Sequence, residues 1–217
     1  MNKKRSLTDE AVLGIEVGQD MVTRRLFNLI MGWDRSCFKD SLENPVENVT
    51  WYDCLFFCNK LSLIVGFEPC FDFRDIKKNA NNVVYEVSVG WNRKANGFRL
   101  LTNQEWILCA EADSEFVFSG SDDPDLVAWY KDNSNGKTQP VGLKKPNKWG
   151  FYDMSGNAAE WCMDPWFDFQ NNLRISRGGS FASDLTELSL NHVLNKSFLN
   201  ETFRSNRLGF RICRTVK

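Results

Sequence analysis

Cysteine and histidine are the side chains of this sequence that could hold a metal ion, form disulfides or act as nucleophile and base. The seven cysteines are Cys37, Cys54, Cys58, Cys70, Cys109, Cys162 and Cys213. Their number is odd and none forms a Cys-x-x-Cys unit, which argues against zinc, redox motifs and an obligatory disulfide framework. We interpret them as small apolar core residues. The only histidine is His192, so a histidine-rich metal site is excluded and a Ser-His-Asp triad would have to use that residue.

The composition favours a soluble chain with a well-filled core. The chain has 217 residues, of which 42% are hydrophobic and 13% aromatic, and this suits one large domain. The net charge is −1 with both signs interspersed, so no basic face invites nucleic acid. Residues 1–5 (MNKKR) look like the start of a signal peptide, but no apolar run follows. We expect no membrane span, since no stretch approaches the ~18 apolar residues that one needs.

Two helices are predicted in the first third of the chain. Residues 21–31 show helical spacing behind Thr23, a residue type that caps helix starts. The apolar stripe of this helix would consist of Leu26, Leu29 and Ile30. Residues 45–66 give the strongest helix signal, with Thr50 or Asp53 as the cap.

A hairpin and a third helix follow. Residues 70–75 and 83–91 are typical of short strands, and the NANN run at 79–82 is typical of the turn between them. Thr102 and Glu105 stand at the spacing of a capping box and predict the start of the next helix.

The remainder predicts irregular structure with short strands. Residues 119–148 are rich in Gly, Asp, Asn, Lys and Pro and favour loop. Strands are expected around 150–152, 160–162, 174–177 and 208–212. The segment 182–207 shows little periodicity, and a loop of that length inside a compact domain is usually functional or disordered. No internal repeat is present, so we predict a single domain over 1–217.

Four segments resemble the formylglycine-generating-enzyme (sulfatase-modifying factor) family. They are PVENVTWYDCLFFCNKLS (45–62), FRLLTNQEWILCAEA (98–112), WGFYDMSGNAAEW (149–161), and RGGSF (177–181) closing with LGFR (208–211). The resemblance implies an α+β, C-type-lectin-like fold with two main helices, small antiparallel sheets and much irregular loop. Large aromatic residues can organise such a loop-rich domain. The expected buried anchors are Trp51, Trp106, Trp149 and Trp161.

The resemblance also sets an expectation about catalysis. Family enzymes that make formylglycine hold copper with two cysteines just after RGGS, since copper(I) prefers thiolates. The matching positions here are Ser183 and Leu188, so we expect no enzyme. A second family branch uses iron held by three histidines, which this chain cannot supply. A metal-dependent oxidase or other family enzyme with a rearranged site is the alternative.

Calcium is the metal ion whose binding the resemblance still allows. Family members bind structural calcium through positions that match Asp153, Gly156, Ala158 and Glu160. Carboxylates and backbone carbonyls are suitable calcium ligands. We therefore expect either one structural calcium ion or metal-free hydrogen bonds from Glu160 to the loop, and no catalytic cofactor. A calcium-dependent sugar-binding lectin is a further alternative, but the Glu-Pro-Asn type of sugar motif is missing from the terminal loop.

The segment 181–207 resembles the variable region of diversity-generating retroelement proteins, in which exposed side chains change on a constant frame. This implies a non-catalytic receptor or adhesion protein with a diversified C-terminal surface. The candidate ligand-binding residues are Phe181, Ser183, Asp184, Thr186, His192, Asn195, Phe203, Ser205, Asn206 and Arg207. Phe181 and Phe203 are either apolar anchors or core residues, and the others are adaptable polar contacts. Leu185 and Leu188 are expected to face inward.

The expected partner is a macromolecule, namely a protein, that the sequence does not identify. We expect a monomer that binds no nucleic acid. The resemblance to variable proteins places it at a bacterial cell surface or outside the cell.

Overall fold

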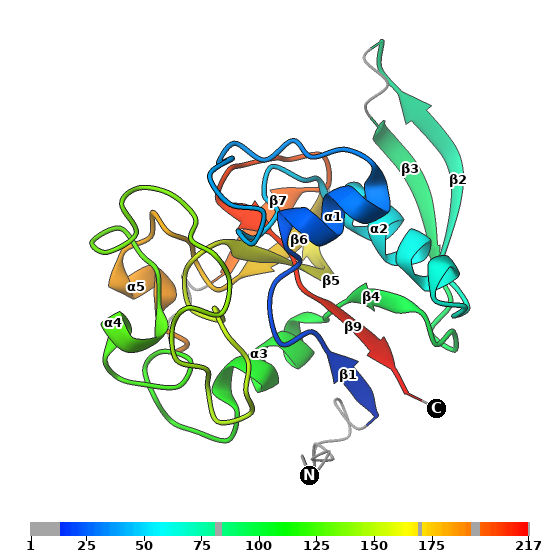
Figure 1. Cartoon of the computed structure of the whole chain (residues 1–217). Helices are drawn as coiled ribbons and strands as arrows, with labels where there is room; N and C mark the ends of the chain where they lie inside the picture. Colours follow the sequence, from blue (N-terminus) through cyan, green and yellow to red (C-terminus); the bar gives the residue numbers. More distant parts are fainter. Residues whose placement is uncertain (1–13, 81–83, 169–170, 192–195, 217) are drawn as a thin grey trace.

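The computed structural model describes residues 14–80, 84–168, 171–191 and 196–216 (Figure 1). Its helices are α1 (Arg24–Met31), α2 (Trp51–Ile64), α3 (Asn103–Glu111), α4 (Pro124–Val127) and α5 (Leu185–Leu188). Its strands are β1 (Ile15–Val17), β2 (Phe71–Lys78), β3 (Val84–Trp91), β4 (Phe98–Leu100), β5 (Ala159–Asp168), β6 (Asn171–Arg177), β7 (Lys196–Asn200), β8 (Leu208–Gly209) and β9 (Ile212–Thr215). None of the helices in these ranges is long and apolar enough to cross a membrane.

The predicted fold class is confirmed, because short helices and small sheets are joined by long irregular segments. The described strands form three sheets, in the orders β1-β9-β4, β2-β3 and β7-β6-β5-β8. The β2–β3 hairpin projects from the rest of the molecule (Figure 1). The strand pairings are antiparallel as expected, except that β8 runs parallel to β5. The long excursion that separates these two strands permits this arrangement, which a tight hairpin turn could not produce.

Capping boxes start the two longest helices; the one at α3 matches the prediction, and at α2 the predicted cap Thr50 forms a box with Asp53. Thr50 Oγ1 accepts a hydrogen bond from the Asp53 amide, and Asp53 Oδ2 accepts one from the Thr50 amide. Thr102 and Glu105 repeat this exchange at the start of α3. Each box satisfies two backbone N–H groups that would otherwise lack partners, and such a cap stabilises a helix by about 1 kcal/mol.

Three of the four predicted tryptophan anchors lie in the core. Trp51, Trp106 and Trp161 are at most 1% exposed. Their indole N–H groups all have acceptors, and that of Trp106 donates to Glu160 Oε2 at 2.9 Å. The prediction is wrong for Trp149, which is only half-buried and donates to a carboxylate at the surface.

The apolar face of α1 differs from the predicted stripe. Thr23 caps this helix as expected. The buried positions are Arg24, Phe27 and Ile30, which recur every third residue and share one face. Leu29 falls off that face and is 76% exposed, because a helix of eight residues packs one narrow side only.

Two segments of the C-terminal half also differ from expectation. Residues 150–152 are not a strand, because Asn147 Oδ1 accepts hydrogen bonds from the amides of Trp149 and Phe151 and folds the chain into a turn. The segment 182–207, which showed little periodicity, contains both α5 and β7.

The cysteines behave as core residues. All seven are free thiols, and six of them are buried. Cys37 is the exposed member. The interpretation as apolar core residues is confirmed for the buried six.

Candidate functional site

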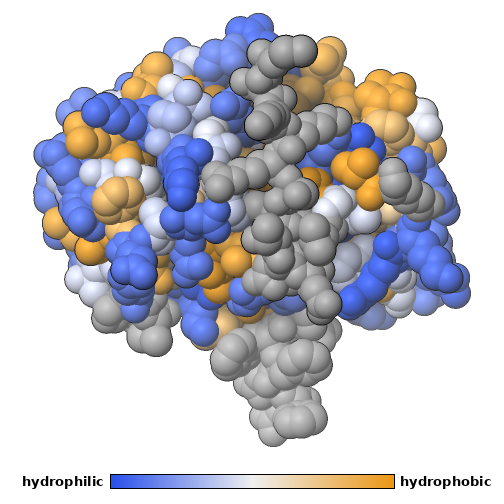
Figure 2. Space-filling view, turned by 90° about the horizontal axis from the view of Figure 1, so that it is seen from below, coloured by the Kyte–Doolittle hydropathy of each residue, from blue (hydrophilic) through white to orange (hydrophobic). Residues whose placement is uncertain are grey.

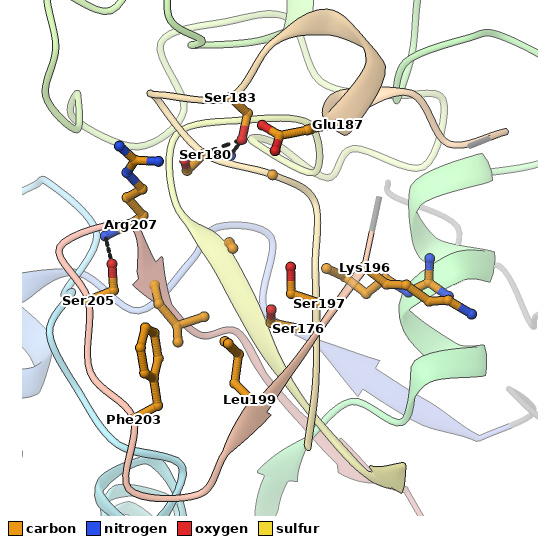
Figure 3. A pocket seen from close by; sticks show the side chains of 14 residues that line it. Ser176, Ser180, Ser183, Glu187, Lys196, Ser197, Leu199, Phe203, Ser205 and Arg207 are labelled. Carbon is orange, nitrogen blue, oxygen red and sulfur yellow. Dashed lines mark hydrogen bonds between the residues drawn. The ribbon is translucent and has the colours of Figure 1, made fainter. Parts of the chain in front are cut away.

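A pocket of about 340 Å³ lies where β6, β7, α5 and residues 203–208 meet (Figure 3). Its hydroxyl side chains are Ser176, Ser180, Ser183, Ser197 and Ser205. Its charged side chains are Arg177, Glu187, Lys196 and Arg207. Its apolar side chains are Ala159, Leu199, Phe203 and Leu208. Convergent polar groups beside apolar surface are typical of a ligand site.

A tight turn after β6 forms one side of the pocket. Gly178 and Gly179 have φ angles of 93° and 67°, in the left-handed region that favours glycine. A Cβ atom on Gly179 would lie 2.7 Å from Leu188 Cδ2. The turn brings Ser183 back to the end of the strand, where its Oγ accepts a hydrogen bond from the Ser180 amide at 3.0 Å.

The pairing of β6 with β7 forms the middle of the pocket. Ser176 lies opposite Ser197, and Arg177 lies opposite Lys196. Residues directly opposite in an antiparallel pair bring their side chains together. This register therefore places the two hydroxyl groups together on one face of the β6–β7 ladder and the two basic groups together on the other.

The chain after β7 forms the other side of the pocket. Its backbone carbonyl groups accept hydrogen bonds from other parts of the fold. The carbonyl oxygen of Ser205 accepts a hydrogen bond from the Asn48 amide at 2.9 Å. That of Arg207 accepts one from the Ala159 amide at 2.8 Å. The side chains of Phe203, Ser205 and Arg207 line the pocket on this side (Figure 3).

The structure brings together part of the predicted ligand-binding set. The predicted residues that line the pocket are Ser183, Phe203, Ser205 and Arg207. The predicted residues outside its lining are Phe181, Asp184, Thr186 and Asn206. Asp184 instead caps α5 through hydrogen bonds from the amides of Thr186 and Glu187. His192 and Asn195 lie outside the described residues.

Phe181 is a core residue and not a surface anchor. It is 4% exposed, and its ring stands edge-on to Phe38 with the centroids 5.2 Å apart. Phe203 is 44% exposed and fits the anchor role. Leu188 is buried as expected, whereas Leu185 is 41% exposed because the short helix α5 buries one side only.

Sequence reasoning missed several lining residues. Arg177 and Ser180 lie within the RGGSF motif, which is the signal that could have found them. Ser176, Lys196 and Ser197 join the pocket through the β6–β7 register, and no pattern in the sequence predicted β7.

The two positions expected to match the family's copper ligands are Ser183 and Leu188, and neither side chain carries sulfur. Ser183 supplies a hydroxyl group, and Leu188 is a fully buried aliphatic residue. None of the described residues that line the pocket is a cysteine or histidine.

Among the residues expected for calcium, Glu160 is paired with the buried guanidinium group of Arg211. Glu160 accepts hydrogen bonds from Arg211 on both carboxylate oxygens and from Trp106 on Oε2. Asp153 Oδ2 accepts one from the Gly142 amide, while Oδ1 is buried without a partner. Burial raises the pKa of Asp153 to about 6. Arg211 balances the charge of Glu160. Within the described residues, no group of three His, Cys, Asp or Glu side chains is arranged to bind a metal.

The fold and pocket define a lectin-like scaffold that carries a polar, basic pocket in its C-terminal third. The chain belongs to the family of the sulfatase-modifying factor enzyme 1-like domain, which it matches over residues 21–216. It is 34% identical to the chaperone protein LppX of Paenibacillus barcinonensis over 206 residues, which are 81% of this chain and 72% of that protein.

Solved structures share the fold. Treponema denticola variable protein 1 superposes with a TM-score of 0.80 and 29% identity, over 93% of this chain and 84% of that one. CarF gives a TM-score of 0.75 and 23% identity over 94% and 87% of the two chains. PvdO from Pseudomonas aeruginosa gives 0.71 and 18% over 94% and 82%. The likeness to a variable protein confirms the resemblance identified from the sequence.

Proposed function

We propose that this protein binds a macromolecular ligand, namely a protein, through the pocket and the surface around it, and that it catalyses no reaction. The observation that carries the proposal is the origin of the lining. All of the lining residues other than Ala159 belong to 176–208, and this range contains the segment 181–207 that resembles a variable region. Ser205 and Arg207 are held through backbone hydrogen bonds, so the exposed side chains in this part of the chain can change without loss of the fold.

The chemistry of the pocket supports binding over catalysis. Ser183 and Leu188 stand where the family's enzymes carry thiolate ligands, and neither can bind copper(I). Serine hydroxyl groups beside the exposed ring of Phe203 resemble the mixture of adaptable polar contacts and aromatic anchors in binding surfaces.

Comparison of gene copies tests this proposal. We expect a neighbouring reverse-transcriptase gene and an invariant template copy of the terminal region. We also expect substitutions at the codons for Phe203, Ser205 and Arg207, with the codons for Gly178 and Gly179 unchanged. A gene without template or reverse transcriptase, with the same residues in all related strains, would contradict diversification.

A second assay tests the absence of catalysis. The purified protein is incubated with copper(I) and a cysteine-containing peptide, and oxygen uptake is recorded. We expect no uptake above that of the Ser183→Ala variant. Uptake that depends on Ser183 would instead establish an oxidase with a rearranged site.

We propose further that the protein is a monomer at a bacterial cell surface or outside the cell. Apolar residues on the face seen from below lie in separate groups among polar ones, as is usual for a monomer (Figure 2). The location is supported by the likeness to variable proteins. Light scattering of the purified protein and protease treatment of intact cells test the two statements.

A further inference from the structure

A second pocket of about 350 Å³ lies between the end of α1, the first half of α2 and the β2–β3 hairpin. Its apolar side chains are Met31, Trp33, Phe56, Ile76 and Val84. Its charged side chains are Arg35, Asp53, Lys78 and Arg204. The two pockets adjoin at residues 203–205, because Phe203 and Ser205 line the pocket at β6 and β7 whereas Arg204 lines the second one.

The apolar part of the second pocket is still open to water. Ile76 is 44% exposed, and the partly buried side chains around it are those of Met31, Trp33, Phe56 and Val84. An apolar group that entered the pocket would remove this surface from water, which is favourable. The pocket therefore suits a ligand with an apolar side chain.

The single carboxylate of the described lining is already engaged. Asp53 Oδ2 accepts a hydrogen bond from the Thr50 amide at 2.9 Å, as part of the cap of α2. The same oxygen lies 3.1 Å from Arg204 Nη2. Arg35 is exposed and forms no ion pair with any described residue. Its guanidinium carbon lies 4.8 Å from the centroid of the Trp33 ring, another part of the lining.

Arg35 and Arg204 are like charges that act on each other in this pocket. The side chain of Arg204 is 19% exposed, and burial lowers its pKa. The ion pair with Asp53 opposes this shift, whereas the positive charge of Arg35 adds to it. One carboxylate thus has to serve two guanidinium groups. A second carboxylate beside Arg35 would offset the repulsion, because opposite charges favour the ionised form of each other.

We infer that the second pocket binds a segment of the protein ligand in which an apolar residue stands next to Asp or Glu. The acidic side chain pairs with Arg35, and the apolar one packs on Phe56 and Ile76. The inference rests on the proposed function and extends the binding surface beyond the pocket at β6 and β7. A guanidinium suits this role, since its planar fork matches a carboxylate. One ligand can contact both pockets, because they adjoin at residues 203–205.

Two matched dipeptides test the inference. N-acetyl-Leu-Glu-amide and N-acetyl-Leu-Gln-amide are titrated into isotope-labelled protein, and backbone amide signals are followed by nuclear magnetic resonance. We expect the acidic peptide to shift signals of residues 31–35 and of the first turn of α2. It should bind about fivefold more tightly than the neutral one, as an exposed ion pair allows.

Two arginine variants locate the preference. Arg35→Gln should bind both peptides equally. The matched control is Arg93→Gln, because Arg93 is also exposed and its guanidinium carbon lies 4.4 Å from the centroid of the Trp91 ring, outside the described lining. This variant should keep the wild-type preference. A preference that survives Arg35→Gln would overturn the pairing with Arg35.

The wild-type titrations do not depend on the folding of any variant. Equal affinity for the two peptides overturns the inference, and so do signal changes confined to β6 and β7. Hexanoate supplies a carboxylate on an apolar chain without a peptide, and tighter binding of hexanoate would identify a fatty-acid site instead. Comparison of gene copies tests the proposed function separately, so failure of one can be distinguished from failure of the other.

Discussion

Arg211 and Glu160 form an ion pair in the interior, with side chains 0% and 1% exposed and 2.8 Å between Nη2 and Oε1. The same guanidinium donates hydrogen bonds to the carbonyl oxygens of Gly18 and Tyr152 at 2.9 and 2.7 Å. It thereby ties β5 to the chain after β1 and to the loop before β5. Removing one partner of a buried ion pair is strongly destabilising, because it leaves the other charge buried without a partner.

We expect Glu160→Gln and Arg211→Met each to lower the free energy of unfolding by about 3–5 kcal/mol, because each leaves a buried charge unpaired. The matched control is Arg214→Met, whose ion pair with Glu16 is 19% and 44% exposed, and this should cost about 0–1 kcal/mol. Urea unfolding measures all three. Equal losses in the buried and exposed pairs would contradict the prediction.

Glu47 should make stability depend on pH. Burial raises its pKa from 4.5 to about 7, which hydrogen bonds from the amides of Phe38 and Cys37 only partly oppose. Because the folded-state pKa exceeds the unfolded one, the folded protein favours the protonated form of the Glu47 carboxyl group. The stability that this group contributes is fully present below pH ~4.5 and is lost as the pH rises through ~7. We expect Glu47→Gln to be more stable than the wild type by about 1–3 kcal/mol at pH 8 and equal to it at pH 4.

Urea unfolding at both pH values checks this expectation. Glu43→Gln, at the surface, controls for the loss of a negative charge nearby. A Glu47→Gln variant that loses stability at pH 8 would show that the carboxylate is needed in its charged form.

Calcium should have little effect on stability, because Arg211 already balances the charge of Glu160. We expect thermal unfolding midpoints with excess calcium and with chelator to agree within about 1 °C, since a ligand that does not bind the native state does not stabilise it. If calcium raised the unfolding midpoint of the wild type but not that of Asp153→Asn, calcium would bind at this site and the prediction would be wrong.

Phe181 and Phe203 should respond differently to truncation. Phe181→Ala leaves a cavity in the core and should cost about 3–5 kcal/mol of stability. Phe203→Ala removes a ring that is 44% exposed and should cost under about 1 kcal/mol. Urea unfolding of the two variants measures the difference. Similar losses would mean that Phe203 is also a core residue and no anchor.

Gly179 should tolerate no side chain, whereas Gly136 controls for backbone strain. Both have positive φ angles, 67° and 69°, but a Cβ on Gly136 would meet nothing within 4 Å. We expect Gly136→Ala to cost about 1 kcal/mol and Gly179→Ala at least twice as much, because the methyl group would collide with Leu188. Equal costs in thermal unfolding would show that the contact yields easily.

Most of the features that could be predicted from the sequence depend on residues that lie close together in the chain. The caps at Thr50 and Thr102 depend on residues three positions away, so the chain alone reveals them. The family motifs likewise indicated the fold. Trp149 and Leu29 show the limit, because their exposure depends on which neighbours pack against them.

The centre of the pocket depends on contacts that no local pattern shows. Lys196 and Ser197 reach it because β7 pairs with β6 in one register. Such properties appear only when the three-dimensional arrangement is known.

The pairing of β1 with β9 has a practical consequence for engineering. Ile15 lies opposite Thr215, so the two ends of the described chain leave the molecule side by side, away from β7 and α5 (Figure 1). A short linker could join them in a circular permutant with new ends at the exposed β2–β3 hairpin. Immobilisation through a residue of β1 or β9 should leave the pocket open to a ligand in solution.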